Sequence, residues 1–349
     1  ISIDDNGDGT VYIEGGFSNG ASAEGVEIIV VKDKAYNGPE ETFKGKEIIY
    51  KGKLDAKNSL TLPKPATDKY EVYFNDTKIA FFVLDPFYRA GKRQWAWADI
   101  LREKDSEFLP LVINVENFSE NRDGKTLLYK RDIETLFHEF GHALHAMLAD
   151  SRYAQLNGFN VERDFVELPS QLMENWVKDQ EALKSLAKHS ETWAKIPLEI
   201  LQTQENLKTR MMGNFVLRQC ELALVDMSIY DSWLPASSEE LERYILEISN
   251  RYSLFPRGQE YQLYCSFLHI FWGWYGAGYY SYMRAELLEA DVFQKIKENW
   301  IFSSQIWNLY RDKILAQGCR KPARELFSDF MWRDPEPKAL MKKYWFMDN

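Results

Sequence analysis

The pattern of hydrophobic and polar positions divides this chain into a β-rich part and a helical part. In residues 1–76, β-branched and aromatic residues form short alternating runs, and Gly, Asn, Asp and Pro lie between them. Such runs are typical of strands joined by turns. We therefore predict strands at 10–14, 26–31, 47–50, 59–62 and 70–74.

The regular spacing of these strands predicts a small antiparallel β-sandwich over residues 1–76. It resembles bacterial immunoglobulin-like modules by pattern alone. Two further strands are expected at 78–84 and 109–118. Beyond them apolar residues recur every three to four positions, which predicts helices, at 130–150, 170–186, 200–229, 238–249, 285–299 and 306–316. We expect residues 77–349 to form one mainly α domain with a small β-sheet.

The helix expected at 130–150 contains His138-Glu139-Phe140-Gly141-His142. Two imidazoles four residues apart lie on one stripe of a helix and can reach one cation. Glu139, rotated by about 100° from His138, can stand beside the open position of the metal. This is the H-E-x-x-H arrangement of zinc hydrolases. His145 lies about 10 Å along the axis from His138, so we expect it to pack or to support a ligand.

A third ligand must come from elsewhere in the chain. A site with two histidines and one carboxylate needs an acidic side chain from a neighbouring helix. The candidates are Glu162, Asp164, Glu167 and Glu174. Spacing alone does not choose among them.

Two motifs resemble the thimet oligopeptidase family of zinc peptidases. They are the segment from His138 to His145, and the segment Val161-Glu-Arg-Asp-Phe-Val-Glu167-Leu-Pro-Ser-Gln171 with Glu174-Asn-Trp176. The resemblance implies a zincin-type helical catalytic domain in which one Zn²⁺ per chain is bound by His138, His142 and Glu167. Glu134 and Asp164, each one turn before a ligand, are either partners of the ligands or solvated charges.

A third segment, from His269 to Tyr282, resembles the substrate-binding loop of the same family, most closely in its dipeptidyl carboxypeptidase branch. The resemblance implies that His269, Tyr275, Tyr279 and Tyr282 contact the peptide, and that the last two tyrosines donate hydrogen bonds to the developing oxyanion. The resemblance covers the chain from about residue 78. Before that point family members carry a long helical half, where this chain has its β-rich segment.

Composition narrows the choice of partner and compartment. The net charge of −10 argues against general nucleic-acid binding. Three widely spaced cysteines make no disulfide framework. No leader follows Ile1, so an export signal is either absent or has been removed, and the cysteines favour the first. We therefore expect a cytoplasmic protein, with a secreted or cell-surface protein as the alternative if the β segment is an extracellular module. The sequence does not predict an oligomeric state.

Two stretches could suggest other sites. No charged residue lies between Glu260 and Arg284, but six tyrosines spread through this stretch argue against a membrane span. Asp4 to Gly9 begins like a calcium loop, yet Gly15 stands where the loop needs a glutamate. We expect the uncharged stretch to form the wall of a buried pocket and the segment from Asp4 to Gly9 to be an acidic turn.

The chain is therefore predicted to be a zinc metallopeptidase, of oligopeptidase or dipeptidyl carboxypeptidase type, that cleaves short or unfolded peptides. Zinc would lower the pKa of a water molecule and polarise the scissile carbonyl, Glu139 would move the proton, and the segment 109–118 would be an edge strand that pairs with the peptide. The alternative is a non-catalytic peptide-binding or adhesion module with a vestigial peptidase region.

Overall fold

A computed structural model describes most of the helical part of the chain and the strands of the β-rich part. The described residues are 2–5, 10–14, 27–35, 42–44, 46–53, 59–63, 70–74, 79–105, 107–119, 128–189, 192–208, 210–231, 235–271, 275–344 and 346.

The β-rich part forms two antiparallel sheets, with strand orders β1-β2-β6 and β4-β5-β3-β7. Their strands are β1 (Ser2–Asp5), β2 (Thr10–Glu14), β3 (Glu27–Ala35), β4 (Thr42–Phe43), β5 (Lys46–Lys53), β6 (Ser59–Pro63) and β7 (Tyr70–Phe74). Ile29 and Val31 of β3 are buried against Phe43 and Ile48. Every predicted strand of this part overlaps an observed one. The immunoglobulin-like resemblance and the domain boundary after residue 76 stay predictions, and most of the calcium-like turn lies outside the described residues.

A small mixed sheet begins the helical part. It has the order β8-β10-β9 and consists of β8 (Phe81–Phe87), β9 (Trp97–Arg102) and β10 (Leu111–Phe118). β10 runs parallel to β8 and antiparallel to β9. The expectation that 109–118 is an edge strand is therefore wrong, because β10 is the central strand and has a neighbour on each side.

One helix packs on this sheet, a second packs on the first, and a third packs on the second. α1 (Lys130–Leu148) covers the sheet, with Ala143 and Ala146 packed against Val112 of β10. Asp132 accepts a hydrogen bond from the backbone N–H of Tyr129, which fixes the start of α1. α2 (Arg163–Met173) and α10 (Ser281–Glu298) supply the main hydrophobic core, together with the C-terminal helices.

Other helices contribute to this core or flank it. They are η1 (Ala154–Leu156), η2 (Gly158–Asn160), α3 (Asn175–Lys178), α4 (Gln180–Leu186), α5 (Leu198–Lys208), α11 (Ser304–Lys313), η3 (Leu315–Gln317), α12 (Ala323–Met331) and α13 (Lys338–Lys343). The helix predicted at 170–186 is three helices, because Asp179 starts α4 by accepting the N–H groups of Glu181 and Ala182. The helix predicted at 200–229 is also divided, at the left-handed residue Met211.

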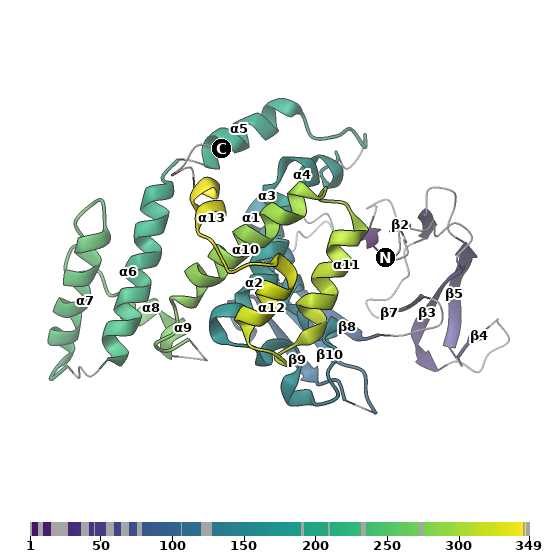
Figure 1. The fold of residues 1–349 in the computed structure, drawn as a ribbon, viewed down its shortest axis with the longest axis horizontal. Helices are drawn as coiled ribbons and strands as arrows, with labels where there is room; N and C mark the ends of the chain where they lie inside the picture. The colour runs from purple at the N-terminus through teal and green to yellow at the C-terminus, as the bar shows by residue number, and fades with distance from the viewer. Residues whose placement is uncertain are drawn as a thin grey trace.

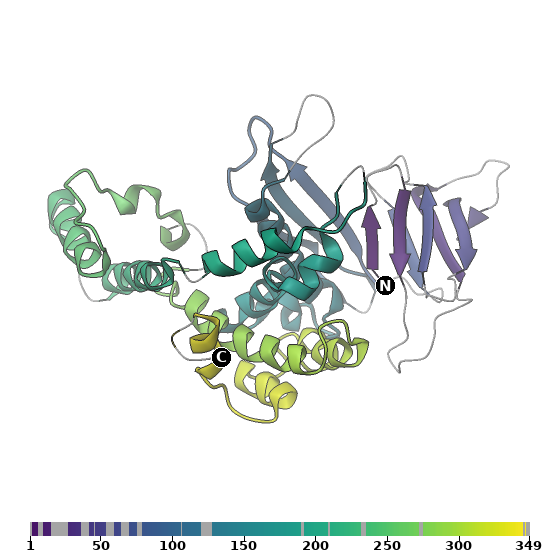
Figure 2. The ribbon, with the colours of Figure 1, turned by 90° about the horizontal axis from the view of Figure 1, so that it is seen from above.

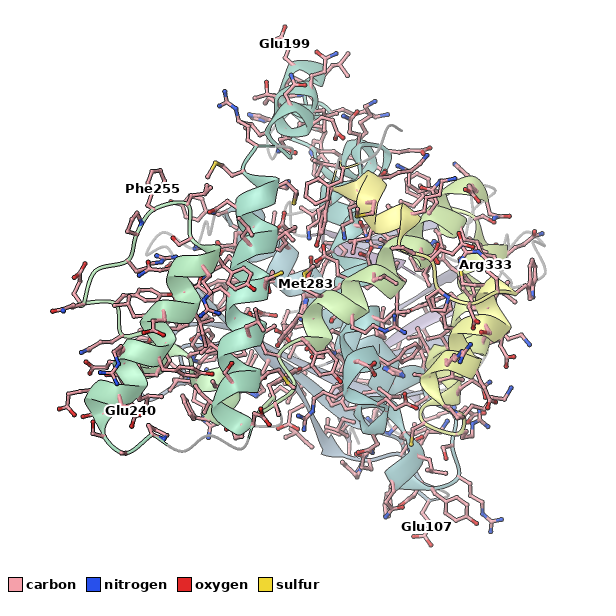
Figure 3. The ribbon with its side chains drawn as sticks, turned by 60° about the vertical axis from the view of Figure 1, so that its left-hand side comes forward. Glu107, Glu199, Glu240, Phe255, Met283 and Arg333 are labelled. Carbon is pink, nitrogen blue, oxygen red and sulfur yellow. The ribbon has the colours of Figure 1, made fainter. Side chains whose placement is uncertain are left out.

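α6 (Met212–Tyr230) and α7 (Ser238–Tyr252) lie side by side at one end of the molecule, and β3, β5 and β7 lie at the other (Figures 1 and 2). The short helices α8 (Leu263–Ser266) and α9 (Leu268–Phe271) pack on α6 and α7. In Figure 3, Met283 of α10 lies in the region between α10 and α6, and Met283, Met212 and Val216 all pack against the cluster of Ala290, Leu340 and Tyr344. These contacts join the α6–α7 pair to the core.

The charge-free stretch between Glu260 and Arg284 contains α8, α9 and the start of α10. Within the described ranges, the structure contains no helix whose length and apolar character would suit a bilayer.

Candidate metal and substrate site

Two neighbouring helices bring a possible set of metal ligands together. Oε2 of Glu167, on α2, lies 3.3 Å from Nε2 of His138 and 3.2 Å from Nε2 of His142, both on α1. The three donor atoms lie within 4.8 Å of one another, and no other such group was found among the described residues. Of the acidic residues that spacing left open, Glu167 is the one whose carboxylate lies close to both histidines.

These separations fit a tetrahedral zinc ion. Zinc binds imidazole nitrogen and carboxylate oxygen at about 2.0–2.2 Å, so two ligands of one ion are separated by about 3.3–3.5 Å. The measured distances of 3.2 and 3.3 Å agree with that separation. The donor set, two imidazoles and one carboxylate, is also one that zinc uses in hydrolases.

Gly141 explains how the two helices approach so closely. A Cβ atom at this position would lie 2.5 Å from the carbonyl oxygen of Pro169 and 2.6 Å from Cα of Ser170. Any larger residue would push α2 away from α1. The glycine between the two histidines therefore sets the distance from His138 and His142 to Glu167.

Neighbouring polar groups orient the ligand side chains. Glu174 accepts from Nδ1 of His138 at 2.7 Å, and Ser170 Oγ donates to Glu167 Oε2 at 2.8 Å. The hydroxyl of Tyr275 donates to the other oxygen of Glu167. Burial lowers the pKa of His138, but the carboxylates of Glu167 and Glu174 outweigh burial and hold that pKa well above its ordinary value. Burial raises the pKa values of Glu167 and Glu174, but the neighbouring imidazoles, with Lys178 at Glu174, outweigh burial and hold both pKa values below their ordinary range.

Glu139 lies beside the ligands and is almost completely buried. Burial raises the pKa of its carboxyl group, although the two ligand histidines oppose the shift. The carboxylate accepts a hydrogen bond from the backbone N–H of Ala98 in β9. A second buried carboxyl group, Glu116 of β10, has a pKa raised to about 8 by burial and by Glu139. The metal side of the site is therefore a water-poor environment with two acids of raised pKa.

Other candidate residues have different partners. His145 is fully buried, its pKa is lowered to about 3 by burial, and its ring nitrogens have no hydrogen-bond partner among the described residues, so it is a packing residue. Glu134 lies 3.5 Å from Lys130, and Asp164 lies 3.8 Å from Arg284. Glu162 accepts from the N–H of Ala323. These pairs are salt bridges or caps, and none of them is a contact with a ligand.

The four residues of the predicted substrate loop form one aromatic cluster. The ring of His269, on α9, lies 6.3 to 6.4 Å from the rings of Tyr275, Tyr279 and Tyr282. Tyr275 and Tyr282 stack at 5.2 Å. Because Tyr275 also bonds Glu167, the cluster is in contact with the ligand carboxylate. Burial raises the pKa of Tyr279 to about 12 and also raises that of Tyr282 well above its ordinary value, so both hydroxyls keep their protons.

Several residues that hold this site were absent from the sequence-based prediction. Ser170 stands inside the motif that identified Glu167, and Glu174 was considered only as a ligand, so both had a local signal. Trp95, in the loop before β9, packs edge-on against His269 at 5.0 Å. No motif pointed to this contact, because the two residues are far apart in the chain.

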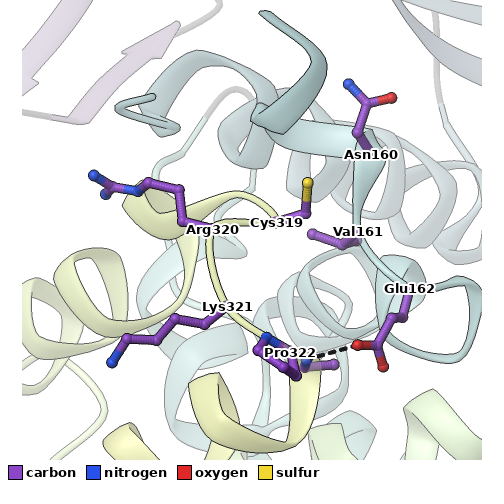
Figure 4. Close-up of a pocket in the computed structure, with 8 residues that line it drawn as sticks. Asn160, Val161, Glu162, Cys319, Arg320, Lys321 and Pro322 are labelled. Carbon is purple, nitrogen blue, oxygen red and sulfur yellow. Dashed lines mark hydrogen bonds between the residues drawn. The ribbon is translucent and has the colours of Figure 1, made fainter. Parts of the chain in front are cut away.

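A separate cavity of about 330 Å³ lies away from these residues (Figure 4). It is lined by Asn160, Val161, Glu162, Cys319, Arg320, Lys321, Pro322 and Ala323. None of the proposed ligands or loop residues contributes to it.

Several known proteins are similar to this chain in sequence. Oligopeptidase A of Salmonella typhimurium is 33% identical over 321 residues, which cover 90% of this chain and 47% of that protein. The organellar oligopeptidase A of Arabidopsis thaliana is 36% identical (76% of this chain, 35% of that protein). Dipeptidyl carboxypeptidase of Salmonella typhimurium is 34% identical (78% and 41%). The chain thus spans about half the length, or less, of the curated relatives it matches.

A solved structure shares the fold. PZ peptidase A with inhibitor 2 matches with a TM-score of 0.51 and 17% identity, over 75% of this chain and 43% of that one. The family model described as Peptidase family M3 matches residues 63–345. The resemblance to the thimet oligopeptidase family is therefore confirmed, and this chain belongs to peptidase family M3.

Proposed function

We propose that this chain is a zinc-dependent metallopeptidase that hydrolyses peptide bonds in short or unfolded peptides. One observation carries the proposal: the carboxylate of Glu167 lies at separations from the two imidazoles that suit a tetrahedral zinc site, with a buried glutamate beside them. Membership of peptidase family M3 supports the reaction class.

His138, His142 and Glu167 would hold the zinc ion. When bound there, zinc supplies Lewis-acid activation of a water molecule and of the scissile carbonyl. Glu174 and Ser170 keep the ligands in the orientation that they have in the structure. Glu139, with its raised pKa, is suited to accept a proton from water and to pass it to the leaving amine.

The aromatic cluster would bind the peptide and stabilise its transition state. Tyr279 and Tyr282 remain protonated at neutral pH, so each offers an O–H donor where negative charge develops on the carbonyl oxygen. Burial lowers the pKa of His269, so it is neutral and can donate to the substrate backbone. Tyr275, predicted to contact the peptide, donates its hydroxyl to Glu167 and would present its ring.

Two coarser assignments accompany this proposal. The proposed partners are peptide substrates. Neither nucleic-acid binding nor a membrane span is part of the proposal. A cytoplasmic location agrees with Cys220, Cys265 and Cys319, which are all free thiols in the structure. The non-catalytic alternative is disfavoured because the ligand set and the glutamate are intact in a chain of a peptidase family.

Metal analysis and digestion test the proposal together. We expect about one zinc per chain, and cleavage of a peptide library that stops when a chelator is added and resumes with zinc. Glu167→Ala should lose most of the metal. Asp164→Ala is the matched control on the same helix, because its carboxylate pairs with Arg284. Full zinc retention in Glu167→Ala would contradict the ligand assignment, and hydrolysis restricted to non-peptide amides would contradict the substrate class.

A further inference from the structure

The loop that carries the predicted substrate tyrosines is bound to a buried carboxylate on another helix. Asp226 of α6 accepts hydrogen bonds from three consecutive backbone N–H groups: Ala277 to Oδ1 at 2.9 Å, and Gly278 and Tyr279 to Oδ2 at 2.8 Å each. Asp226 has no exposed surface. Both of its oxygens are thus used to hold the backbone immediately before and at Tyr279.

A residue of a second helix, α2, also contacts this loop. Arg163, the first residue of α2, donates from Nη1 to the carbonyl oxygen of Gly276 at 3.0 Å. Its side chain also fills the space beside Gly278, where a Cβ atom would lie 2.5 Å from Nη1 and 2.6 Å from Cδ. Because α2 also carries Glu167, one helix positions both a predicted metal ligand and the loop.

A third contact comes from one turn further along α6. The hydroxyl of Tyr230 donates to the carbonyl oxygen of Ile270, and a Cβ atom at Gly276 would lie 2.8 Å from Cζ of Tyr230. Asp226 and Tyr230 are four residues apart, so they lie on one face of α6. This face is therefore in contact with the loop at both positions.

The energetics show that the loop is held in an unfavourable conformation. Ala277 has a φ of 53°, in the left-handed region that non-glycine residues rarely adopt. A buried carboxylate is also costly unless hydrogen bonds compensate it. Bonds from N–H groups to a charged acceptor are among the stronger hydrogen bonds of proteins, and three of them meet at Asp226.

We propose that Asp226, with Arg163, is a positioning residue of the peptidase reaction. It fixes the backbone of Ala277 to Tyr279, and so holds the hydroxyls of Tyr279 and Tyr282 beside Glu167 and the site where the scissile carbonyl would bind. Asp226 touches neither substrate nor metal and acts through the two tyrosines. This inference rests on the proposed peptidase function.

Hydrogen exchange tests the anchoring without any need for activity. In the zinc-loaded chain, Asp226→Asn should accelerate amide exchange in the segment 275–282 by about tenfold or more, because an amide has one acceptor oxygen and adds donors that face the N–H groups. The matched control is Asp291→Asn. Asp291 is also buried on a helix and holds a loop, through Arg333 and the N–H of Glu336, and its variant should leave 275–282 unchanged. Unchanged exchange in Asp226→Asn would overturn the anchoring.

Kinetics test whether the anchoring serves the tyrosines. Asp226→Asn should lower kcat by about tenfold or more and change KM by less than about threefold. The reason is that misplaced hydroxyl donors weaken the stabilisation of the oxyanion, which exists mainly in the transition state. Asp226→Glu keeps the charge and both acceptors and should recover part of the loss. In a Tyr279→Phe, Tyr282→Phe background, the Asn change should cost less than about threefold. A loss as large in that background as in the wild type would refute action through the tyrosines.

A second variant decides the outcome if Asp226→Asn does not fold. Gly278→Ala leaves Asp226 intact but displaces Arg163 or the loop, so it should show the same fast exchange and the same fall in kcat. A folded Gly278→Ala protein with normal exchange and normal kcat would contradict the proposal. A wild-type chain that cleaves no peptide, but whose loop exchange responds to Asp226→Asn, would instead contradict the proposed function and leave the anchoring standing.

Discussion

The predicted metal ligands and the substrate tyrosines touch each other through Tyr275 and Glu167, but they are held in place by different means. His138 and His142 are placed by one turn of α1, and Glu167 by the close contact at Gly141. The tyrosine loop has only short helical turns before it and depends on Asp226, which lies 51 to 53 residues earlier in the chain. Helix geometry therefore fixes one half of the site, and remote hydrogen bonds fix the other.

The largest effect should come from the metal half. Glu139→Gln removes the proton acceptor and leaves every proposed ligand in place, so it should keep zinc and stability but lower kcat by roughly 10³- to 10⁴-fold. The measurement is steady-state hydrolysis of a fluorogenic peptide together with metal analysis. Glu134→Gln, on the same helix and paired with Lys130, is the control that should behave as wild type. Near-normal turnover in Glu139→Gln would remove this residue from the mechanism.

The loop half should give the next largest effect. Tyr279→Phe and Tyr282→Phe should each lower kcat by about 10²-fold, more than they raise KM, because a donor aimed at developing charge is used mainly in the transition state. Tyr280→Phe is the matched control, since this neighbouring side chain is half-exposed. If neither change reaches about tenfold, the tyrosines are packing residues and the loop does not take part in the chemistry.

The two parts of the site also differ in how a buried carboxyl group is compensated. Asp226, behind the tyrosine loop, accepts three hydrogen bonds. Glu116, near the proposed ligands, has no hydrogen-bond partner among the described residues. The pKa of Glu116 is raised to about 8, so its protonated form is the one the fold favours. Its contribution to stability is fully present below the unfolded-state pKa of about 4.5 and is lost as the pH rises through about 8.

Glu116→Gln should therefore gain stability over the wild type as the pH rises. We expect a gain of about 2–3 kcal/mol between pH 5 and pH 8 in the metal-free protein. Denaturant unfolding at several pH values measures it, and Glu325→Gln, which removes an exposed carboxylate from α12, is the control. A difference between wild type and Glu116→Gln that does not change with pH would show that Glu116 is ionised with an undetected partner.

The smallest expected effect tests the contact between the helices. Gly141→Ala should destabilise the fold by about 1–3 kcal/mol and weaken zinc binding, because the new methyl group would overlap Pro169 and Ser170. Gly213→Ala is the control: a Cβ atom there meets nothing within 4 Å, so it should be neutral or stabilise α6 by about 0.5–1 kcal/mol. Unchanged zinc affinity in Gly141→Ala would mean that α2 can move without separating the ligands.

The same contrast explains how far sequence reasoning reached. The spacing of His138 and His142 is a local property, so the helix and its two candidate ligands could be predicted from the pattern. Glu167 needed the family resemblance, because four acidic residues satisfied the same requirement. Asp226 could not be found, since nothing near it in sequence reveals that it meets Ala277, Gly278 and Tyr279.

Elements were misjudged where tertiary contacts override local pattern. Asn114 and Glu116 alternate with apolar residues in β10, as on a solvent-facing strand, yet both are fully buried. The edge-strand prediction rested on a common way of holding extended peptides, and nothing local to residues 109–118 revealed that β9 pairs with β10. Met211 carries no helix-breaking side chain, yet it divides the helix predicted at 200–229 by adopting a φ of 61°.

The hydrogen bond between Tyr275 and Glu167 has a consequence for the order in which the molecule is built. His138 and Glu174 are 36 residues apart, whereas Tyr275 and Glu167 are 108 residues apart. Contacts between near neighbours in sequence form with a smaller loss of chain entropy than distant ones. During synthesis, which proceeds from the N-terminus, α1 and α2 can be complete while the tyrosine loop is still unmade. We therefore expect a growing chain to acquire the proposed metal affinity before the proposed hydrolytic capacity.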